Sequence, residues 1–247
     1  MSSIAGKRVW ITGGGTGVGA GSALLLAERG AEVILSGRRA DKLDAVVAQI
    51  TAKGGKASAV AVDMADAAAV EQAAGKIGQV DILLASAGLN VPNRSLDKLG
   101  TADWDTVVNV NLNGVYYPIH AVLPQMRTRG DGLVMIVSSW AGRHVGRLTG
   151  AAYTATKHAV VALSETINCE EGGNGIRSTV IMPGEIATDI LKARPTPPSQ
   201  ADMDRMLQVD DLAETVRYVA EMPAHVCVNE ILLSPTWNRF YQGFAEV

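Results

Sequence analysis

Short apolar runs alternate with helical segments along nearly the whole chain of 247 residues, and this alternation restricts the fold more than any other feature. The predicted strands are 8–12, 32–36, 57–62, 82–85, 133–137, 178–182 and 230–233. The predicted helices are 18–29, 40–53, 65–77, 102–126, 151–168 and 210–221. Strands that are apolar on both faces and joined by helices form parallel sheets covered on both sides. No linker or change of composition divides residues 1–247, so we expect a single α/β domain.

Composition excludes several functional classes. The chain has 22 Lys and Arg against 25 Asp and Glu, a net charge of −3, without the clustered basic excess that nucleic-acid binding requires. Cys169 and Cys227 fit neither a metal-ligand spacing nor a disulfide framework, and we expect both thiols to be reduced and buried. The four histidines form no zinc pattern. We therefore expect no metal and no nucleic-acid partner.

No apolar stretch has the length of a membrane span. Residues 1–7 lack the apolar core of a signal peptide. The most apolar stretches are broken by Asn, Gly or a charge within about a dozen residues, short of the ~20 that a spanning helix needs. These patterns predict a cytoplasmic protein with no membrane partner.

A glycine-rich turn follows the first predicted strand. Its residues are Thr12, Gly13, Gly14, Gly15, Thr16, Gly17, Val18 and Gly19. Glycines permit positive φ and let the backbone approach a pyrophosphate, and the helix that begins there turns its free N–H groups toward the anion. Surface loops also collect glycine. The position between a first strand and a first helix is the context that a dinucleotide-binding turn requires.

The end of the second strand indicates which dinucleotide would bind. An NAD site places an acidic side chain here, on the ribose 2′-hydroxyl. This chain has Gly37 instead, followed by Arg38 and Arg39. Guanidinium groups pair well with phosphate, which favours NADP(H), although a solvated arginine pair opening a helix is the alternative. Asp63 could bond the adenine or cap the next helix, and we assign it, with the adjacent Met64, to the cofactor site.

Three side chains form a candidate catalytic group. Tyr153 and Lys157 lie four residues apart on a predicted helix, so they share a face. A nearby ammonium favours phenolate and lowers a tyrosine pKa, which makes Tyr153 a usable general acid or base. Ser139 closes the fifth predicted strand, and open α/β sheets bind ligands at the carboxyl ends of their strands. A Tyr-x-x-x-Lys pattern alone is usually a solvated surface pair. It indicates a catalytic site here because it occurs together with the glycine-rich turn and with Ser139 at a strand end.

These motifs together resemble the short-chain dehydrogenase/reductase family over nearly the whole chain. The matching positions are Thr12-Gly13-x-x-x-Gly17-x-Gly19, Asn111, Ser139, Tyr153, Lys157 and Pro183-Gly184-Glu185-Ile186-Ala187-Thr188. The resemblance implies a doubly wound Rossmann domain with a seven-stranded parallel sheet and helices on both faces. It also implies a homotetramer or homodimer. Its cofactor residues here would be Gly13, Gly15, Thr16, Gly17, Val18, Gly19, Arg38, Arg39, Asp63, Met64, Gly88, Tyr153, Lys157, Pro183, Gly184, Ile186 and Thr188.

The resemblance also implies a mechanism. Hydride passes between NADP(H) and a carbonyl carbon, while Tyr153 donates a proton to the carbonyl oxygen and Ser139 hydrogen-bonds it. Lys157 lowers the Tyr153 pKa and binds the nicotinamide ribose. Asn111 holds a water in a proton relay, and Thr188 with the backbone near Ile186 fixes the carboxamide.

Three positions depart from the family pattern. Ala85-Ser86-Ala87-Gly88 replaces the common Asn-Asn-Ala-Gly, which leaves Gly88 but removes two side-chain amides. The spacing from Ser139 to Tyr153 is one residue longer than usual, so Ser138 could substitute for Ser139 if the register shifts. The segment 225–236 around the last predicted strand looks like the NADP-dependent hydroxy-acid and small-alcohol dehydrogenase branch.

The substrate side is less defined by the sequence. Prolines 195, 197 and 198 forbid regular structure, and we expect a lid over about 189–208. The predicted pocket residues are Asn90, Trp140, His144, Val145, Glu185 and Ile190. Charges that could favour an anionic substrate are Arg143, Arg147, Lys192 and Arg194, whereas Glu185 could receive an amine. The expected substrate is a small polar aldehyde, ketone or hydroxy acid. An NAD-dependent catabolic alcohol dehydrogenase or a non-catalytic nucleotide-binding protein is the alternative.

Aromatic side chains crowd the C-terminal tail, 237–247. The chain has only two Phe, four Trp and five Tyr, yet Trp237, Phe240, Tyr241 and Phe244 all lie there. Aromatic residues are enriched in interface cores and are a liability when exposed. We expect the tail to dock on another subunit; packing on its own domain is equally compatible with the sequence.

Overall fold

The computed structural model describes residues 2–189, 191 and 196–241. Its seven parallel strands follow the order β3-β2-β1-β4-β5-β6-β7. Their bounds are β1 Arg8–Thr12, β2 Glu32–Gly37, β3 Lys56–Ala61, β4 Ile82–Ala85, β5 Gly132–Val137, β6 Ile176–Pro183 and β7 Glu230–Leu233. Each predicted strand is present within one or two residues of its expected ends. The expected doubly wound α/β fold is confirmed.

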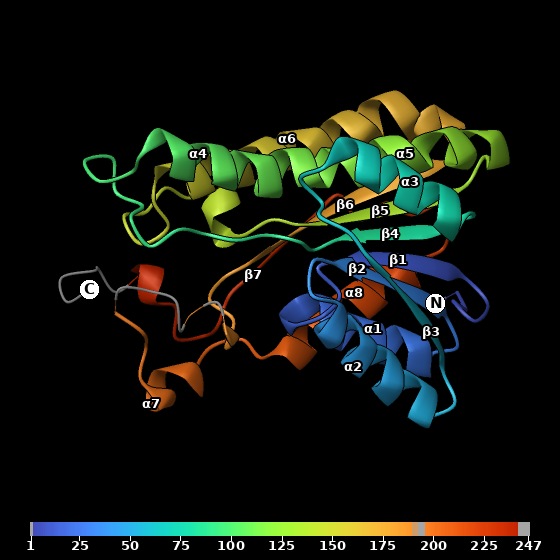
Figure 1. The fold of residues 1–247 in the computed structure, drawn as a ribbon, viewed down its shortest axis with the longest axis horizontal. Helices are drawn as coiled ribbons and strands as arrows, with labels where there is room; N and C mark the ends of the chain where they lie inside the picture. Colours follow the sequence, from blue (N-terminus) through green and yellow to red (C-terminus); the bar gives the residue numbers. More distant parts are fainter. Residues whose placement is uncertain (1, 190, 192–195, 242–247) are drawn as a thin grey trace.

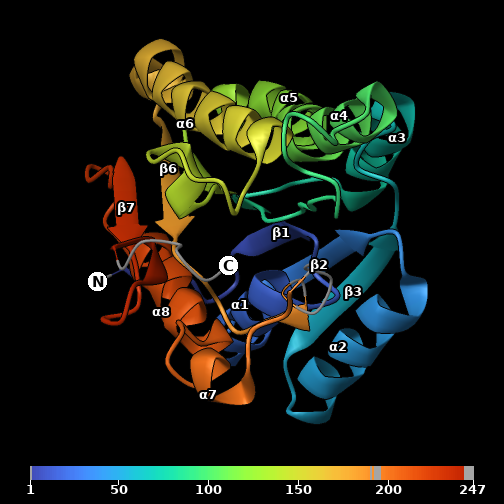
Figure 2. The same ribbon diagram turned by 90° about the vertical axis from the view of Figure 1, so that its left-hand side faces the viewer.

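Helices cover both faces of the sheet (Figure 1). The first face carries α3 Ala67–Ile77, α4 Thr101–Val108, α5 Gly114–Arg129 and α6 Ala151–Glu171. The second face carries α1 Gly17–Glu28, α2 Ala40–Ala52 and α8 Val209–Ala220. The short α7 Gln200–Met203 lies outside these two layers, beyond the carboxyl ends of the strands (Figures 1 and 2). Brief 3₁₀ turns are η2 Trp140–Gly142, η3 Gly172–Asn174 and η5 Arg239–Tyr241.

Two hydrophobic cores lie on the two faces because successive strand residues point to opposite sides. In β1, Trp10 joins the core under α3, α5 and α6, whereas Val9 and Ile11 join the core under α1, α2 and α8. The indole of Trp10 is fully buried and its Nε1 donates to Ser36 Oγ at 2.9 Å. The only polar atom of this large side chain is therefore satisfied inside the core.

The predicted continuous helix over 102–126 was wrong in one respect. Residues Asn109–Asn113 form a π-helical segment of five residues between α4 and α5. The fully buried Asn111 lies in this segment, and its side chain bonds the backbone of Leu89 in the loop after β4. Such segments occur mostly as local insertions at functional sites. Apolar periodicity could not reveal it, because both halves of the helix keep an apolar face.

The chain order reverses at the β1–β4 pair. From β1 the sheet continues through β2 and β3, whereas from β4 it continues the other way through β5, β6 and β7. Open α/β sheets bind ligands at such a switch point, at the carboxyl ends of the strands. Here Ser86 Oγ, just after β4, donates to Thr12 O at 2.5 Å, and Ala87 N donates to Thr12 Oγ1 at 3.3 Å. Ser86 thereby fixes the two strand ends without the family's asparagine.

The cysteines differ from expectation. Both Cys169 and Cys227 are exposed thiols, so the prediction that they are buried was wrong. Cys169 lies near the end of α6, and Cys227 lies in the loop before β7, where its Sγ is 3.4 Å from Asn168 Oδ1. Neither position belongs to a core-facing stripe of the sequence. In the described part of the chain, no group of three His, Cys, Asp or Glu side chains could hold a metal ion. Within the same part, every helix is too short or too polar to cross a bilayer.

Candidate active site

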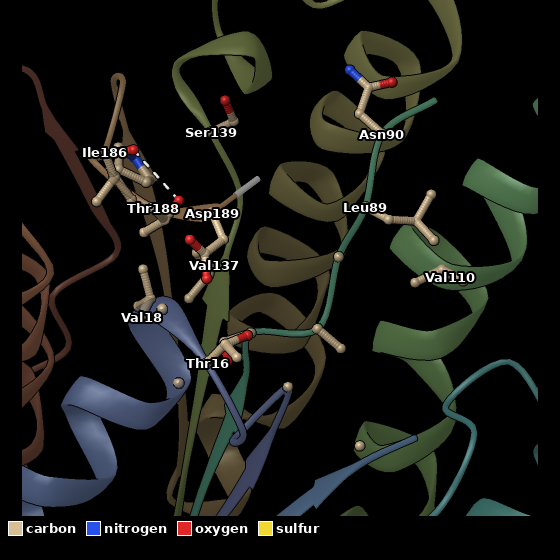
Figure 3. A pocket seen from close by; sticks show the side chains of 18 of the residues that line it. Thr16, Val18, Leu89, Asn90, Val110, Val137, Ser139, Ile186, Thr188 and Asp189 are labelled. Carbon is tan, nitrogen blue, oxygen red and sulfur yellow. Dashed lines mark hydrogen bonds between the residues drawn. The ribbon is translucent and has the colours of Figure 1, made fainter. Parts of the chain in front are cut away.

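A cleft of about 580 Å³ opens at the carboxyl ends of the strands, at the β1–β4 switch point. All the residues predicted to bind a cofactor line it, and so do Ser139, Tyr153 and Lys157. Figure 3 shows Val18, Ile186 and Thr188 on one side and Leu89, Asn90 and Val110 on the other, with Thr16 and Ser139 toward opposite ends. The fold therefore brings together motifs that are up to about 175 residues apart in the sequence.

The glycine turn has no room for side chains at two positions. A Cβ on Gly19 would lie 2.4 Å from Gly13 O and 2.7 Å from Ser86 Oγ. Gly13 has a φ of 69°, and a Cβ there would lie 2.9 Å from the backbone of Ala87. The N-cap of α1, Thr16, makes no capping hydrogen bond with its side chain. The first N–H groups of α1 thus face the cleft, as a pyrophosphate requires.

Cationic side chains line the end of the cleft beside β2. Arg38 and Arg39 follow the strand, both exposed, and Arg39 Nη2 lies 3.4 Å from Thr16 Oγ1. Lys42, which the sequence analysis did not predict, lines the cleft from the first turn of α2. It lies close to the glycine turn, because a Cβ added to Gly15 would be 3.0 Å from the Lys42 Cβ. Three cations at this end, with Gly37 in place of a carboxylate, suit a phosphate rather than a ribose hydroxyl.

Asp63 lies at the edge of the same cleft. Its Oδ1 accepts from Ala65 N at 3.0 Å, which closes a tight turn after β3. The N-cap of α3 is Asp66, whose Oδ1 accepts from Ala69 N at 3.0 Å. Of the two roles considered for Asp63, helix capping therefore belongs to Asp66. Met64 is buried beside Asp63, and its carbonyl would be 3.1 Å from a Cβ on Gly114, so α5 passes close to this turn.

The two serines after β5 have different environments. Ser138 is buried and its Oγ donates to the carbonyl of Lys157 at 2.8 Å. Ser139 is half-buried, and its Oγ accepts from Ala141 N at 3.2 Å at the start of η2. A hydroxyl that is also a donor remains able to bond an incoming oxygen. Ser139 is thus the serine whose hydroxyl can reach a ligand, and Ser138 ties β5 to α6.

Tyr153 and Lys157 share one face of α6, as the spacing predicts. Lys157 Nζ lies 5.5 Å from the centre of the Tyr153 ring. The ammonium is almost wholly buried and donates to Val137 O at 2.9 Å. Burial lowers the pKa of Lys157 from 10.5 to about 8. The half-buried ring of Tyr153 packs beside the small core of Val91, Val107 and Ala152.

Asn111 lies behind the cleft wall rather than on it. Its Oδ1 accepts from Leu89 N and its Nδ2 donates to Leu89 O, both at 2.8 Å. A Cβ on Gly88 would be 3.5 Å from both Asn111 Oδ1 and Lys157 Nζ. Asn111 and Lys157 therefore both approach Gly88, in the loop after β4. The direct effect of the Asn111 side chain is to hold residues 88 and 89, and the water relay stays a prediction.

The segment from Pro183 to Thr188 forms the wall opposite Leu89. Gly184 N donates to Leu233 O at 2.8 Å, and Ala187 N donates to Leu207 O at 2.8 Å. These bonds fasten the segment to β7 and to the chain before α8. Thr188 Oγ1 lies 3.4 Å from Ile186 O (Figure 3) and its methyl lies 3.5 Å from where a Cβ on Gly17 would be. The Thr188 side chain consequently faces the glycine turn across the cleft.

The predicted substrate-side residues are only partly brought together. Asn90 and Glu185 line the cleft, and Ile190 lies outside the described residues. Trp140 does not line it, because it is buried under His144, Phe240 and Tyr241, with ring centroids at 4.5, 6.1 and 5.5 Å. His144 and Val145 are exposed, Val145 to 86 %. The prediction that these three residues line the pocket was wrong, since η2 turns the chain outward after Ser139.

The predicted flanking charges are also used differently. Arg143 pairs with Glu230, whose carboxylate raises the Arg143 pKa. Glu185 is buried, and both its carboxylate oxygens accept from Arg239 at 2.7 and 2.8 Å. Arg147 is exposed. Lys192 and Arg194, with Pro195 of the expected lid, lie outside the described residues.

Several cleft residues escaped sequence reasoning. They are Lys42, Ser86, Arg94, Leu148, Thr149, Leu191 and Phe240. Arg94 lies in the loop after β4, and its Nη1 donates to Leu148 O at 3.1 Å, which joins that loop to the one before α6. Except for Lys42 in α2 and Phe240 in η5, these residues come from the segments that connect the main elements, where no periodic pattern predicts position.

The chain belongs to the short-chain dehydrogenase/reductase family. The family model described as short chain dehydrogenase matches residues 7–198. An uncharacterized oxidoreductase of Listeria monocytogenes, Lmo0432, is 34 % identical over 247 residues, covering 95 % of this chain and 98 % of that protein.

The chain is also similar to a reductase and to an alcohol dehydrogenase of known structure. The chain is 34 % identical over 248 residues to the glycine betaine reductase ATRR of Emericella nidulans. The matched region covers 94 % of this chain but only 19 % of that protein. A structure of an alcohol dehydrogenase from the archaeon Thermococcus sibiricus, complexed with 5-hydroxy-NADP, superposes with a TM-score of 0.85. It is 28 % identical and covers 94 % of this chain and 98 % of that one. An oxidoreductase with a nicotinamide cofactor is consistent with all of these.

Proposed function

We propose that this protein is an NADP(H)-dependent oxidoreductase that transfers hydride between the nicotinamide and a small polar carbonyl or alcohol compound, acting on CH–OH groups. The observation that carries the proposal is the convergence of Ser139, Tyr153 and Lys157 on the cleft whose other end is the glycine turn of α1. This arrangement combines a proton donor, a hydrogen-bond donor and a buried cation with a dinucleotide cradle.

The residues present fit the dinucleotide. Gly13 and Gly19 leave the pyrophosphate approach open, and the N-terminus of α1 lacks a side-chain cap. Arg38, Arg39 and Lys42 would hold the 2′-phosphate, and the segment 183–188 would hold the nicotinamide end. When bound, the cofactor supplies or accepts the hydride. NADP in the similar Thermococcus sibiricus structure supports the choice of cofactor.

The chain's own residues manage the proton and the developing charge. The Tyr153 hydroxyl donates its proton to the carbonyl oxygen during reduction and takes it back during oxidation. The Ser139 hydroxyl donates a hydrogen bond to the same oxygen and stabilises its charge. The buried ammonium of Lys157, fixed by Val137 O, favours the phenolate form of Tyr153.

Assembly and location belong to the same proposal. The family resemblance implies a homotetramer or homodimer, and the sequence patterns noted above favour the cytoplasm. Tyr116 on α5 is 46 % exposed, and Trp104 on α4 is 39 % exposed, so the outer helical face offers apolar surface for a second copy. Sedimentation equilibrium on the purified full chain measures the assembly, and a monomer at micromolar concentration would contradict this part.

The central test measures absorbance of the reduced cofactor with a panel of aldehydes, ketones and hydroxy acids. We expect NADPH-dependent reduction of small polar members of the panel. Tyr153→Phe should lower kcat by roughly 10²–10⁴-fold with little change in NADPH affinity, because only the proton donor is lost. Full turnover in Tyr153→Phe, or reduction confined to bulky apolar ketones, would refute the assignment. A preference for NADH would favour the catabolic alternative, and nucleotide binding without any turnover would favour a non-catalytic protein.

A further inference from the structure

The described part of the C-terminal tail forms a wall of the cleft of its own chain. We call residues 237–241, which include η5, the C-terminal turn. Phe240 lines the cleft, and its ring stacks on Trp140 with centroids 6.1 Å apart and planes at 25°. On another side, Phe240 Cε1 lies 3.5 Å from where a Cβ on Gly146 would be. Residues near Ser139 in the chain thus hold this ring, which places it at the substrate end rather than the phosphate end.

A buried ion pair anchors the C-terminal turn to the cleft. Arg239 Nε and Nη2 donate to the two carboxylate oxygens of Glu185 at 2.8 and 2.7 Å. The side chain of Glu185 is 4 % exposed, and that of Arg239 is 18 % exposed. A bidentate pair fixes orientation as well as distance. Hydrogen bonding to Glu185 raises the Arg239 pKa, which favours the charged guanidinium.

Three more contacts immobilise the turn. The guanidinium of Arg205 lies 3.9 Å from the centre of the Trp237 ring. Asn238 is 3 % exposed, and its Oδ1 accepts from Phe240 N at 3.0 Å. Tyr241 meets the edge of Trp140 at 5.5 Å. The backbone of Phe240 is therefore held by Asn238, and its ring is held against the ring of Trp140.

The anchor also belongs to the segment that walls the nicotinamide end. Glu185 lies between Gly184 and Ile186, and its carbonyl accepts from Leu207 N at 3.1 Å. Its side chain reaches the C-terminal turn while its backbone reaches the chain before α8. The Glu185 carboxylate is paired with Arg239, so this carboxylate is already neutralised and is a poor partner for a substrate amine. What this part of the wall offers a substrate is the aromatic face of Phe240.

Building on the proposed function, we propose that Phe240 is a specificity-determining residue that limits the size of the substituent on the substrate's carbonyl carbon. Glu185 and Arg239 are the positioning pair that holds Phe240 in place. The substrate class is accordingly narrowed to carbonyl compounds with short substituents. A ring clamped between Trp140 and Gly146 cannot turn aside for a bulky group.

The test uses the full-length protein, NADPH and two aldehydes of the same reactivity, propanal and 3-phenylpropanal. Phe240→Ala should raise the ratio of kcat/KM for 3-phenylpropanal over propanal at least tenfold. Most of the change should appear in KM, with the NADPH Kd, measured by cofactor fluorescence, unchanged. The matched control is Arg143→Gln, which breaks the exposed Arg143–Glu230 pair outside the cleft and should leave the ratio within twofold of wild type.

The positioning pair is tested separately. Glu185→Gln should raise the KM for propanal about tenfold, leave kcat within about threefold, and speed amide hydrogen exchange of a peptide covering 237–241. Arg239→Met should also raise the KM for propanal. Arg239→Lys, which keeps the positive charge, should raise it less. Matching thermal melting temperatures would show that the variants are folded.

Failure of this inference can be told from failure of the proposed function. NADPH-dependent turnover with an unchanged substrate ratio in Phe240→Ala would overturn the specificity role and leave the proposed function standing. No turnover with any carbonyl in wild type would overturn the proposed function and the specificity role. Faster exchange at 237–241 in Glu185→Gln would still support the anchor, and unchanged exchange would overturn it.

Discussion

The ammonium of Lys157 donates to the carbonyl oxygen of Val137 at 2.9 Å, and this bond joins the first half of α6 to the carboxyl end of β5. The same lysine carbonyl accepts from Ser138 Oγ at 2.8 Å, so the helix and the strand are tied at two atoms. Lys157 thus holds its own helix in place. Its charge is buried 5.5 Å from the ring of Tyr153.

Burial of Lys157 predicts a pH dependence of stability. Its pKa is about 8 in the folded protein and 10.5 in an unfolded chain, so the unfolded chain binds more protons between these values. Stability therefore rises with pH across this window. Relative to Lys157→Met, the wild-type apoprotein should gain up to about 3 kcal/mol of unfolding free energy from pH 8 to pH 10.5. Urea unfolding of both proteins at several pH values measures the difference. A difference that stayed flat would mean that the ammonium is solvated.

The two neighbouring serines should have separable effects. Ser139→Ala removes the hydroxyl that can reach a carbonyl oxygen, so kcat should fall roughly 10²–10³-fold. The lost bond to Ala141 N should cost about 1 kcal/mol of stability or less. Ser138→Ala removes the bond from Ser138 Oγ to the Lys157 carbonyl, which keeps its place in the ladder of α6, and should cost about 0.5–1.5 kcal/mol of unfolding free energy. Steady-state kinetics and urea unfolding of both variants measure the two effects. If Ser138→Ala lost more turnover than Ser139→Ala at equal folded fraction, the roles would be exchanged.

Arg38 should govern the choice between the two nicotinamide dinucleotides. Replacing this cation by a carboxylate in Arg38→Asp removes a phosphate partner and supplies a ribose partner. NADPH affinity should fall about 10- to 100-fold, the equivalent of about 1.5–3 kcal/mol for a charge-assisted hydrogen bond, while NADH affinity is kept or improved. Cofactor fluorescence titration measures both constants. Lys53→Asp, which removes an exposed cation outside the cleft, is the control, and an equal loss for both cofactors would argue against a 2′-phosphate site at Arg38.

Gly19 and Gly75 offer opposite outcomes for one substitution. An alanine Cβ at position 19 would be 2.4 Å from Gly13 O, so Gly19→Ala must displace the turn. We expect a loss of roughly 1–3 kcal/mol of stability and a weaker NADPH complex. Gly75 lies inside α3 with nothing within 4 Å of a new Cβ, so Gly75→Ala should stabilise the protein by up to about 1 kcal/mol. Thermal unfolding with and without NADPH compares the two, and a neutral Gly19→Ala would refute the close approach.

Periodic patterns predicted most of the fold. The strands are short runs of apolar residues bounded by glycine or charge, and both signals are local. The catalytic candidates could be predicted because Tyr153 and Lys157 share one helix and Ser139 ends one strand. The glycine turn could be predicted because its context, between a strand and a helix, is itself local.

The remaining features depend on contacts between distant segments. The π-helical segment at Asn109–Asn113 is stabilised by bonds from Asn111 to Leu89, 22 residues earlier in the chain. Trp140 was expected at the pocket, but it lies in η2 and is covered by His144 and the C-terminal turn. The Glu185–Arg239 pair spans 54 residues, and no spacing rule links them. The described tail contacts its own domain through these bonds, whereas docking on another subunit stays a prediction.

The reversal of chain order at β1 and β4 has a consequence for how such a protein can change. The candidate 2′-phosphate residues Arg38, Arg39 and Lys42 come from the first half of the chain, whereas Ser139, Glu185 and Phe240 come from the second. The two sets meet only across the cleft. Replacements that exchange one dinucleotide for the other should therefore be additive with replacements that exchange one carbonyl compound for another. Because the sheet is divided in this way, the preference for a dinucleotide and the preference for a carbonyl compound can evolve independently within a single domain.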